Sequence, residues 1–175
     1  MGRWSRQELE DAIQNYRDTA RKSATSGDWT HWANLFIEDV TYNEHHFGKF
    51  AGRDAVYRWI SSIMSNYPMN HMIYFPWTWY TVDEERGWVV CELMNRMKDP
   101  GDGSLHEEPN ITILHSAGNL KWRYEEDAYD FENVARMIAR WQETKDHCDK
   151  LIAQGRDPRQ ERHLSKFGNV EVKRP

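Results

Sequence analysis

The sequence contains few of the residues and patterns that mark several large classes of protein. Only two of its 175 residues are cysteine, and Cys91 and Cys148 form no metal-type spacing. This scarcity excludes a disulfide-dense scaffold and favours two free thiols in a reducing compartment. The chain also lacks an apolar signal core near its start and any hydrophobic run of transmembrane length. We therefore expect a cytoplasmic protein that does not enter a membrane.

Charge of one sign is not concentrated in any segment. The 28 acidic and 23 basic residues give a net charge of −5, and no block of like charge stands out. Binding to a phosphate backbone therefore has little support, and we expect no nucleic-acid partner. A glycine-rich phosphate loop, a Gly-x-Ser-x-Gly elbow and Cys/His zinc spacing are also missing, so we expect neither a cofactor nor a metal.

Aromatic residues are abundant. They make up 13% of the chain and include nine tryptophans, which argues for a folded core in spite of the polar average composition. A length of 175 residues suits one domain. We assign residues 1–154 to that domain and residues 155–175, which are polar and lack periodicity, to a loosely ordered tail.

Apolar residues recur at helical spacing in four segments. Ser5 and Glu8 fit a capping box at the start of the first, and Asp130 is a suitable N-cap for the last. Asp39 is expected to end the second helix, and Tyr67 with Pro68 the third. The predicted helices cover about residues 5–25, 29–39, 53–67 and 131–152.

The remaining segments have the composition of strands. Residues 40–50 resemble a strand with a bend, and four further strands are expected over residues 71–83, 88–98, 106–115 and 120–128. Short turns between consecutive strands predict an antiparallel meander. Because helices and strands are segregated along the chain, the fold class is α+β.

Two stretches carry a family resemblance: GDWTHWANLFIEDVTYNEHHFGKFAGRDAV (27–56) and EEPNITILHSAGNLKWRYEEDAYD (107–130). They resemble the nuclear transport factor 2-like, or SnoaL-like, superfamily over about residues 5–131. The resemblance implies a cone-shaped, curved antiparallel sheet packed against N-terminal helices around a central pocket, with a C-terminal helix. Its members include ketosteroid isomerases, polyketide cyclases, scytalone dehydratase-like enzymes, limonene epoxide hydrolases and proteins without catalysis, so the fold does not fix the function.

Asn110 is the first candidate for a catalytic residue. Alternation along strand 106–115 places Glu108, Asn110, Thr112 and Leu114 on one face. Aligned with the ketosteroid isomerases, Asn110 matches their protonated oxyanion-hole acid, and its NH₂ group could donate to a developing enolate oxygen. The alternative is a pocket hydrogen bond without a catalytic role.

Glu44 is the second candidate. The resemblance places it either at the isomerases' proton-moving carboxylate or, together with Tyr42, at the pair that positions water in limonene epoxide hydrolases. An aromatic pocket would raise its pKa toward that of a useful general base. The alternative is that residues 44–46 form a solvated bend paired with a Lys or Arg.

His71 is the third candidate, because related dehydratases and dehydrochlorinases place a catalytic histidine near this position. The aspartate that would pair with it is replaced here by Thr25 or Ser26. A structural histidine at the start of a strand is the alternative, although only histidine titrates unaided near neutral pH.

Asp127 is the fourth candidate. It falls where limonene epoxide hydrolases keep one acid of an Asp-Arg-Asp relay, and the other two relay positions are Leu93 and Asn95. Epoxide hydrolysis by that relay is therefore disfavoured. Asp127 could instead form a salt bridge with Arg123 on the same strand face.

The isomerases also carry a tyrosine on their first helix as the main oxyanion donor. In this chain that position is Ala20, and a tyrosine lies one turn earlier. The residues expected to bind the substrate are Tyr16, Trp32, Tyr42, His46, Trp59, Cys91, Asn95 and Thr112.

The aromatic residues suit an apolar ligand, although most of them are equally explained by core packing. Residues Trp77–Tyr80 place aromatics on both faces of one strand. Such a strand is expected to be covered on both sides, so we expect a homodimer.

Together these features predict a lyase or isomerase without a cofactor, acting on an apolar, cyclic, oxygenated small molecule. Glu44 or His71 would move the proton, Asn110 with Tyr42 or Asn95 would hold the substrate oxygen, and Asp127 would orient a neighbour or water. The alternative is a dimeric protein of the same fold that binds a small molecule, or serves as an accessory protein, without catalysis.

Overall fold

Six strands form one open sheet in the order β2-β1-β6-β5-β4-β3. The computed structural model describes residues 4–161. The strands are β1 (Phe36–Glu44), β2 (Gly48–Ala51), β3 (Trp77–Asp83), β4 (Trp88–Arg96), β5 (Glu107–Gly118) and β6 (Lys121–Ala128). The α-helices are α1 (Arg6–Ser26), α2 (Thr30–Ala33), α3 (Arg53–Met64) and α4 (Phe131–Ala153), with 3₁₀ turns at Met69–His71 and Pro158–Gln160.

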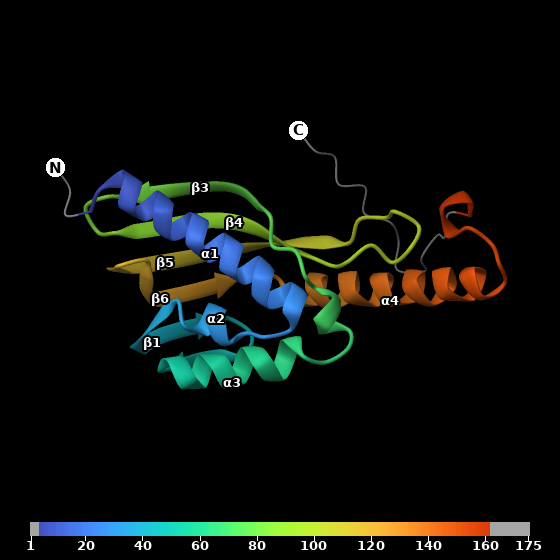
Figure 1. Cartoon of the computed structure of the whole chain (residues 1–175), viewed down its shortest axis with the longest axis horizontal. Coiled ribbons are helices and arrows are strands. Elements are labelled where there is room, and N and C mark those ends of the chain that lie inside the picture. Colours follow the sequence, from blue (N-terminus) through green and yellow to red (C-terminus); the bar gives the residue numbers. More distant parts are fainter. Residues whose placement is uncertain (1–3, 162–175) are drawn as a thin grey trace.

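The helices lie mainly on one side of the sheet. Figure 1 shows α1 crossing one face of the sheet, with α2 and α3 beside β1. Helix α4 extends beyond the strands at the right of the view. Helix α1 begins where the Ser5 side chain accepts a hydrogen bond from the Glu8 amide, and it ends at Gly27 in the left-handed conformation. Its buried residues recur every three or four positions, from Leu9 to Ala24, so one stripe of the helix joins the core.

The α+β class and the meander are confirmed, because β3, β4, β5 and β6 pair antiparallel in sequence order. Two predictions about the fold are wrong. The second helix does not reach Asp39, because it ends at Ala33 and β1 already begins at Phe36. The sheet is not purely antiparallel, because β1 pairs parallel to β6. The long connection through β2, α3 and the meander allows this parallel pairing.

Residues paired across neighbouring strands point to the same face. On the face toward α1, one row across the sheet is Glu44, Asp127, Thr112 and Cys91, and the next row contains Tyr42 and Glu125. Two adjacent rows of the sheet therefore bring three carboxylates and a tyrosine to one place.

A β-bulge decides which residues of β6 face inward. His115 pairs with Tyr124 and Ser116 with Trp122, so Arg123 has no partner in the register. Trp122 is completely buried, whereas Arg123 is exposed. Alternation counted back from Asp127 would have placed Arg123 inside. The expected salt bridge between Arg123 and Asp127 is therefore wrong.

The structure describes only part of the predicted tail. Of the predicted tail 155–175, residues 155–161 are described and include the 3₁₀ turn at Pro158–Gln160, and the remaining residues lie outside the described part. Within residues 4–161, none of the helices combines the length and apolar character needed to cross a bilayer.

The β3–β4 turn offers a test of the packing around Trp4. Gly87 has φ +71°, and a Cβ at this position would come within 2.5 Å of the Trp4 indole nitrogen. We expect Gly87→Ala to lower the free energy of unfolding by about 1–3 kcal/mol, through both the positive φ and the clash. Gly103→Ala is the matched control, because Gly103 has φ +80° and nothing within 4 Å. Equal losses in urea denaturation would show that the Trp4 contact contributes nothing.

Candidate active site

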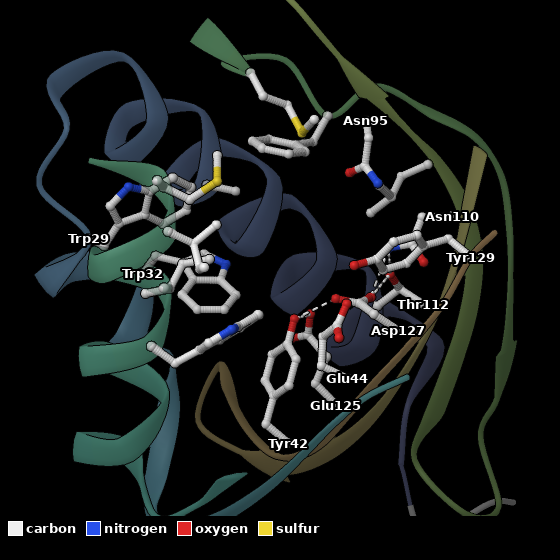
Figure 2. A pocket seen from close by; sticks show the side chains of 18 of the residues that line it. Trp29, Trp32, Tyr42, Glu44, Asn95, Asn110, Thr112, Glu125, Asp127 and Tyr129 are labelled. Atoms are coloured by element: carbon white, nitrogen blue, oxygen red, sulfur yellow. Dashed lines mark hydrogen bonds between the residues drawn. The ribbon is translucent and has the colours of Figure 1, made fainter. Parts of the chain in front are cut away.

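A cavity of about 120 Å³ lies between the inner face of the sheet and helices α1, α2 and α3. Its size is close to that of an engineered cavity of about 150 Å³ that binds benzene. Figure 2 shows Trp29 and Trp32 on one side of the cavity, and Asn110, Thr112, Asp127 and Tyr129 on the other. The cavity thus has an apolar end near the helices and a polar end on β1, β5 and β6.

The polar end is a hydrogen-bonded cluster around Asp127. One carboxylate oxygen of Asp127, Oδ1, accepts hydrogen bonds from Thr112 Oγ1 at 2.5 Å and Asn110 Nδ2 at 2.9 Å. The other, Oδ2, accepts a hydrogen bond from the Tyr42 hydroxyl. Asp127 retains some accessible surface, and it lines the cavity. Three donors therefore hold an ionised carboxylate against the space that a ligand would occupy.

Glu125 lies behind Asp127 and is only 1% exposed. Its Oε1 is 2.7 Å from the Tyr16 hydroxyl and 3.1 Å from the Tyr42 hydroxyl, whereas its Oε2 has no partner among the described residues. A buried carboxylate oxygen without a donor is costly when the group is ionised. The geometry therefore favours a neutral Glu125.

The count of protons supports the same assignment. Tyr42 has one hydroxyl proton but contacts both Asp127 and Glu125. Because the contact with Asp127 is the shorter one, we assign the Tyr42 proton to the hydrogen bond with Asp127. The longer contact then requires a proton on Glu125, which is donated to the Tyr42 oxygen. The cluster then forms a chain in which Glu125 donates to Tyr42 and Tyr42 donates to Asp127.

The acidities of the two carboxyl groups differ for physical reasons. Burial raises the pKa of Glu125 well above its ordinary value, the nearby Asp127 carboxylate raises it further, and the Tyr16 and Tyr42 hydroxyls oppose the rise. Burial also raises the pKa of Asp127, but Thr112, Tyr42 and Asn110 all donate to its ionised form and oppose the rise. Two neighbouring carboxyl groups with different surroundings are a common basis for an acid and a base in one site.

Glu125 gives a testable pH dependence of stability. Its pKa is raised in the folded state, so its contribution to stability is present below the ordinary Glu pKa of about 4.3 and is lost as pH rises toward the folded-state pKa. We expect urea denaturation between pH 5 and 9 to show a smaller decline for Glu125→Gln than for the wild type. The difference in slope cannot exceed about 1.4 kcal/mol per pH unit for one proton.

Glu126→Gln is the matched control for this measurement. Glu126 points to the opposite face, where hydrogen bonds from Tyr124 and His45 lower its pKa. This variant should keep the wild-type decline. If the curves of Glu125→Gln and the wild type run parallel, Glu125 is ionised in the folded state.

Asn110 faces the cavity, as alternation along the strand predicted. Its NH₂ group, which was expected to be free to donate to a ligand, is already hydrogen-bonded within the protein. Its NH₂ group is engaged by Asp127 and Thr112, and its carbonyl oxygen Oδ1 has no partner in the described part of the chain. Asn110 therefore cannot offer the expected donor to a substrate oxygen while it also holds Asp127. The geometry assigns it to positioning Asp127, and its carbonyl oxygen is buried.

Glu44 also faces the cavity, and it is only 2% exposed, so the alternative of a solvated bend is wrong. Its Oε2 accepts hydrogen bonds from the His46 amide at 2.8 Å and the Phe47 amide at 2.5 Å. One oxygen of Glu44 is thus engaged in holding the β1–β2 turn. Its neighbour Tyr129 has a pKa raised by burial and by this carboxylate.

The structure brings together nine of the twelve predicted site residues. Three do not line the cavity: His71, His46 and Cys91. His71 contacts the Trp141 ring of α4 at a tilted angle, His46 stacks on Phe131 at the surface, and Cys91 is fully buried within the sheet. The nine that line it are Tyr16, Trp32, Tyr42, Glu44, Trp59, Asn95, Asn110, Thr112 and Asp127.

Sequence reasoning missed Glu125. The signal was present, because Glu125 lies two residues before Asp127 and alternation places both on one face. Asn95, which is expected to bind the substrate, lines the cavity. Its side chain makes no hydrogen bond to another described residue, and Figure 2 shows it pointing into the cavity from β4, so it is available to a ligand.

Residues 4–161 contain no group of three or more His, Cys, Asp or Glu side chains arranged to hold a metal ion. The carboxylates of the cavity are instead bonded to hydroxyl, amide and backbone N–H donors.

Comparison with known proteins places the chain among proteins of related fold. A family model described as "SnoaL-like domain" matches residues 5–132. No protein with a curated description matches the chain by sequence.

Solved structures extend the comparison. A candidate polyketide cyclase from Xanthomonas campestris pv. campestris is 16% identical, with 76% of this chain and 98% of that chain covered and a TM-score of 0.57. A protein with a ketosteroid isomerase-like fold from Catenulispora acidiphila, in complex with trimethylamine, is 17% identical, with 73% and 92% covered and a TM-score of 0.55. An LEH-like epoxide hydrolase from M. tuberculosis is 10% identical, with 81% and 91% covered and a TM-score of 0.55. At these identities the likeness concerns the fold alone.

Proposed function

The chain belongs to the SnoaL-like domain family, and within it we propose that this protein is a lyase or isomerase that moves protons on a small cyclic oxygenated substrate without a cofactor. The observation that carries the proposal is the pair of carboxyl groups at one end of an apolar cavity. Asp127 is partly accessible and accepts three hydrogen bonds, Glu125 is buried with one oxygen unpartnered among the described residues, and Tyr42 lies between them.

Asp127 is the proposed general base. Its raised pKa brings it closer to the range in which a base works efficiently near neutral pH. Oδ2 accepts one hydrogen bond from the described residues, so it has room to take a proton from a bound ligand. Asn110 and Thr112 fix the orientation of the carboxylate and are positioning residues.

Glu125 and Tyr42 would supply the second part of the chemistry. When Asp127 accepts a proton from a substrate carbon, the negative charge passes from Asp127 to the substrate oxygen, and Asp127 then returns the proton to another carbon. Tyr42 stays between the two carboxyl groups, and Glu125 stays neutral, so the site carries no second negative charge. Such chemistry requires only positioned donors and acceptors, because the substrate carries its own acidic hydrogen. Asn95 is the proposed donor to the substrate oxygen, since its amide has no partner among residues 4–161.

The cavity also favours a specific kind of substrate. Its lining is mostly aromatic and aliphatic, and its volume of about 120 Å³ suits a single ring. Two tryptophans that line it, Trp29 and Trp59, each have a buried indole N–H group without a partner in the described residues. An oxygenated ligand would satisfy such donors, whereas a pure hydrocarbon would not.

The proposal can be tested with simple cyclic ketones. We expect the protein to accelerate conversion of cyclohex-3-enone to its conjugated isomer, followed by ultraviolet absorbance, and exchange of the α-hydrogens of cyclohexanone in D₂O, followed by NMR. If these compounds bind, as judged by a raised melting temperature, but neither reaction exceeds the rate in buffer, the alternative of a non-catalytic binding protein is correct.

A homodimer is a further part of the proposal. Trp79 is 46% exposed, and Trp88 is 37% exposed and stacks on His115, which stacks on Tyr124. Strand pairing places these four residues on the face opposite the cavity. A second copy would cover this aromatic surface, and sedimentation equilibrium would detect it.

A further inference from the structure

A second depression adjoins the cavity and is lined by arginine side chains. It has a volume of about 410 Å³ and lies between α1 and the segment that precedes β3. Its lining residues are Gln14, Arg17, Asp18, Arg21, Tyr74, Phe75, Pro76 and Arg96. Arg17 and Phe75 also line the cavity, so the two spaces adjoin at these residues. We call this depression the arginine groove.

Arg17 lines both the cavity and the arginine groove. Its guanidinium lies over the Trp77 ring at 5.8 Å from the centroid, and Trp77 lines the cavity. Stacking on a ring uses the face of a guanidinium and leaves its N–H groups at the edge free for hydrogen bonds. An anionic group beside Trp77 could therefore receive two parallel hydrogen bonds from Arg17.

The charges of the groove are not balanced by the protein. Arg17 and Arg21 are four residues apart on α1, so they face the same side, and neither makes an ion pair with another described residue. Like charges at this spacing destabilise a helix. Arg96 is paired with Glu107 at 2.6 Å, and Asp18 accepts a hydrogen bond from Gln14 at 3.0 Å. Within the groove, Asp18 is the sole acidic residue of the described chain, against three arginines.

We infer that the arginine groove binds the carboxylate of a ligand whose ring occupies the cavity. The inference rests on the proposed function for the nature of the cavity and adds the substrate class: a small cyclic organic acid. A short aliphatic tether would carry the carboxylate from the ring past Phe75 to Arg17 and Arg21. The oxygenated part of the ring would remain near Asp127 and Asn95.

Matched pairs of ligands test this inference. The probes are phenylacetate, 3-phenylpropionate and 4-phenylbutyrate, each compared with its primary amide by titration calorimetry at low salt. For at least one tether length, we expect the acid to bind about tenfold more tightly than the amide, and we expect this preference to shrink as salt is added. In the double variant Arg17→Ala, Arg21→Ala, acid and amide should bind within about twofold of each other.

Arg58→Ala is the matched control, because Arg58 is an exposed arginine in a separate depression beside α3. It should keep the full preference for the acid. Equal binding of acid and amide by the wild type, absence of binding by every acid, or a preference that survives in the double variant would each overturn the inference.

Failure of the inference can be separated from failure of the proposed function. Asp127→Asn should keep the preference for the acid, because Asp127 is not part of the groove. If the protein prefers the acids but catalyses no hydrogen exchange, carboxylate binding in the arginine groove is supported and the proposed catalytic function is refuted. If the protein catalyses hydrogen exchange but binds acid and amide equally, the proposed catalytic function is supported and carboxylate binding in the arginine groove is refuted.

Discussion

Asp127→Asn is expected to lower the rate of ketone isomerisation and hydrogen exchange by about 10²–10⁴-fold, the usual contribution of a positioned general base. Asparagine keeps the size of the side chain but cannot accept the proton. Ligand affinity should change little, because the ring of the ligand binds against the apolar wall. The effect should therefore appear in kcat rather than in KM.

Glu126→Gln is the control for Asp127→Asn. Glu126 is the adjacent residue of β6, but it bonds to His45 and Tyr124 on the other face of the sheet. Its replacement removes the same charge without touching the cavity, so the rate should stay within about twofold of the wild type. If the two variants lose activity equally, or if Asp127→Asn keeps its activity, another group is the base.

The second large effect is expected from Tyr42→Phe. The hydroxyl of Tyr42 bonds to Asp127 and Glu125, so its removal leaves both carboxyl groups short of a partner. We expect the free energy of unfolding at neutral pH to fall by about 1–3 kcal/mol. Loss of a donor to the ionised form should raise the pKa of Asp127 further, so the acidic limb of the pH–rate profile should move to higher pH.

Tyr16→Phe is the matched control for Tyr42→Phe. The Tyr16 hydroxyl bonds to Glu125 at 2.7 Å and not to Asp127. This variant should lose stability, but it should leave the acidic limb of the profile in place. An unchanged profile for Tyr42→Phe would mean that Tyr42 has only a structural role.

Much of the fold could be predicted from local patterns. The Ser5 and Asp130 caps, the apolar stripes of α1 and α4 and the turns of the meander are short-range signals, and each agrees with the structure. The second helix was overestimated because Trp29, Trp32, Ala33 and Phe36 fit a helical stripe. Phe36 is buried because it begins β1, and period alone cannot distinguish a short buried strand from a helix.

The site could be predicted only where strand alternation held. Asn110 and Thr112 on β5 face the cavity as alternation requires, and so do Tyr42 and Glu44 on β1. The parallel pairing of β1 with β6, which brings Glu125 beside Tyr42, joins segments about 80 residues apart and leaves no local signal. The bulge at Arg123 changes the face on which residues of β6 lie, and the sequence did not mark it.

The partners of each polar group were also beyond the sequence. Whether Asn110 offers its NH₂ group or its carbonyl to a ligand depends on Asp127, which lies on the neighbouring strand. Glu44 has the burial expected of a base, but the amides of its own turn occupy one of its oxygens.

The proposed catalysis requires a neutral Glu125 beside an ionised Asp127 at neutral pH. The most direct measurement is NMR of the protein with ¹³C-labelled side-chain carboxyl groups, titrated with pH and assigned with Glu125→Gln and Asp127→Asn. We predict that the Glu125 resonance has the protonated position at pH 7 while that of Asp127 has the ionised position. Two carboxyl groups that both titrate near the ordinary values of Glu and Asp would contradict the account.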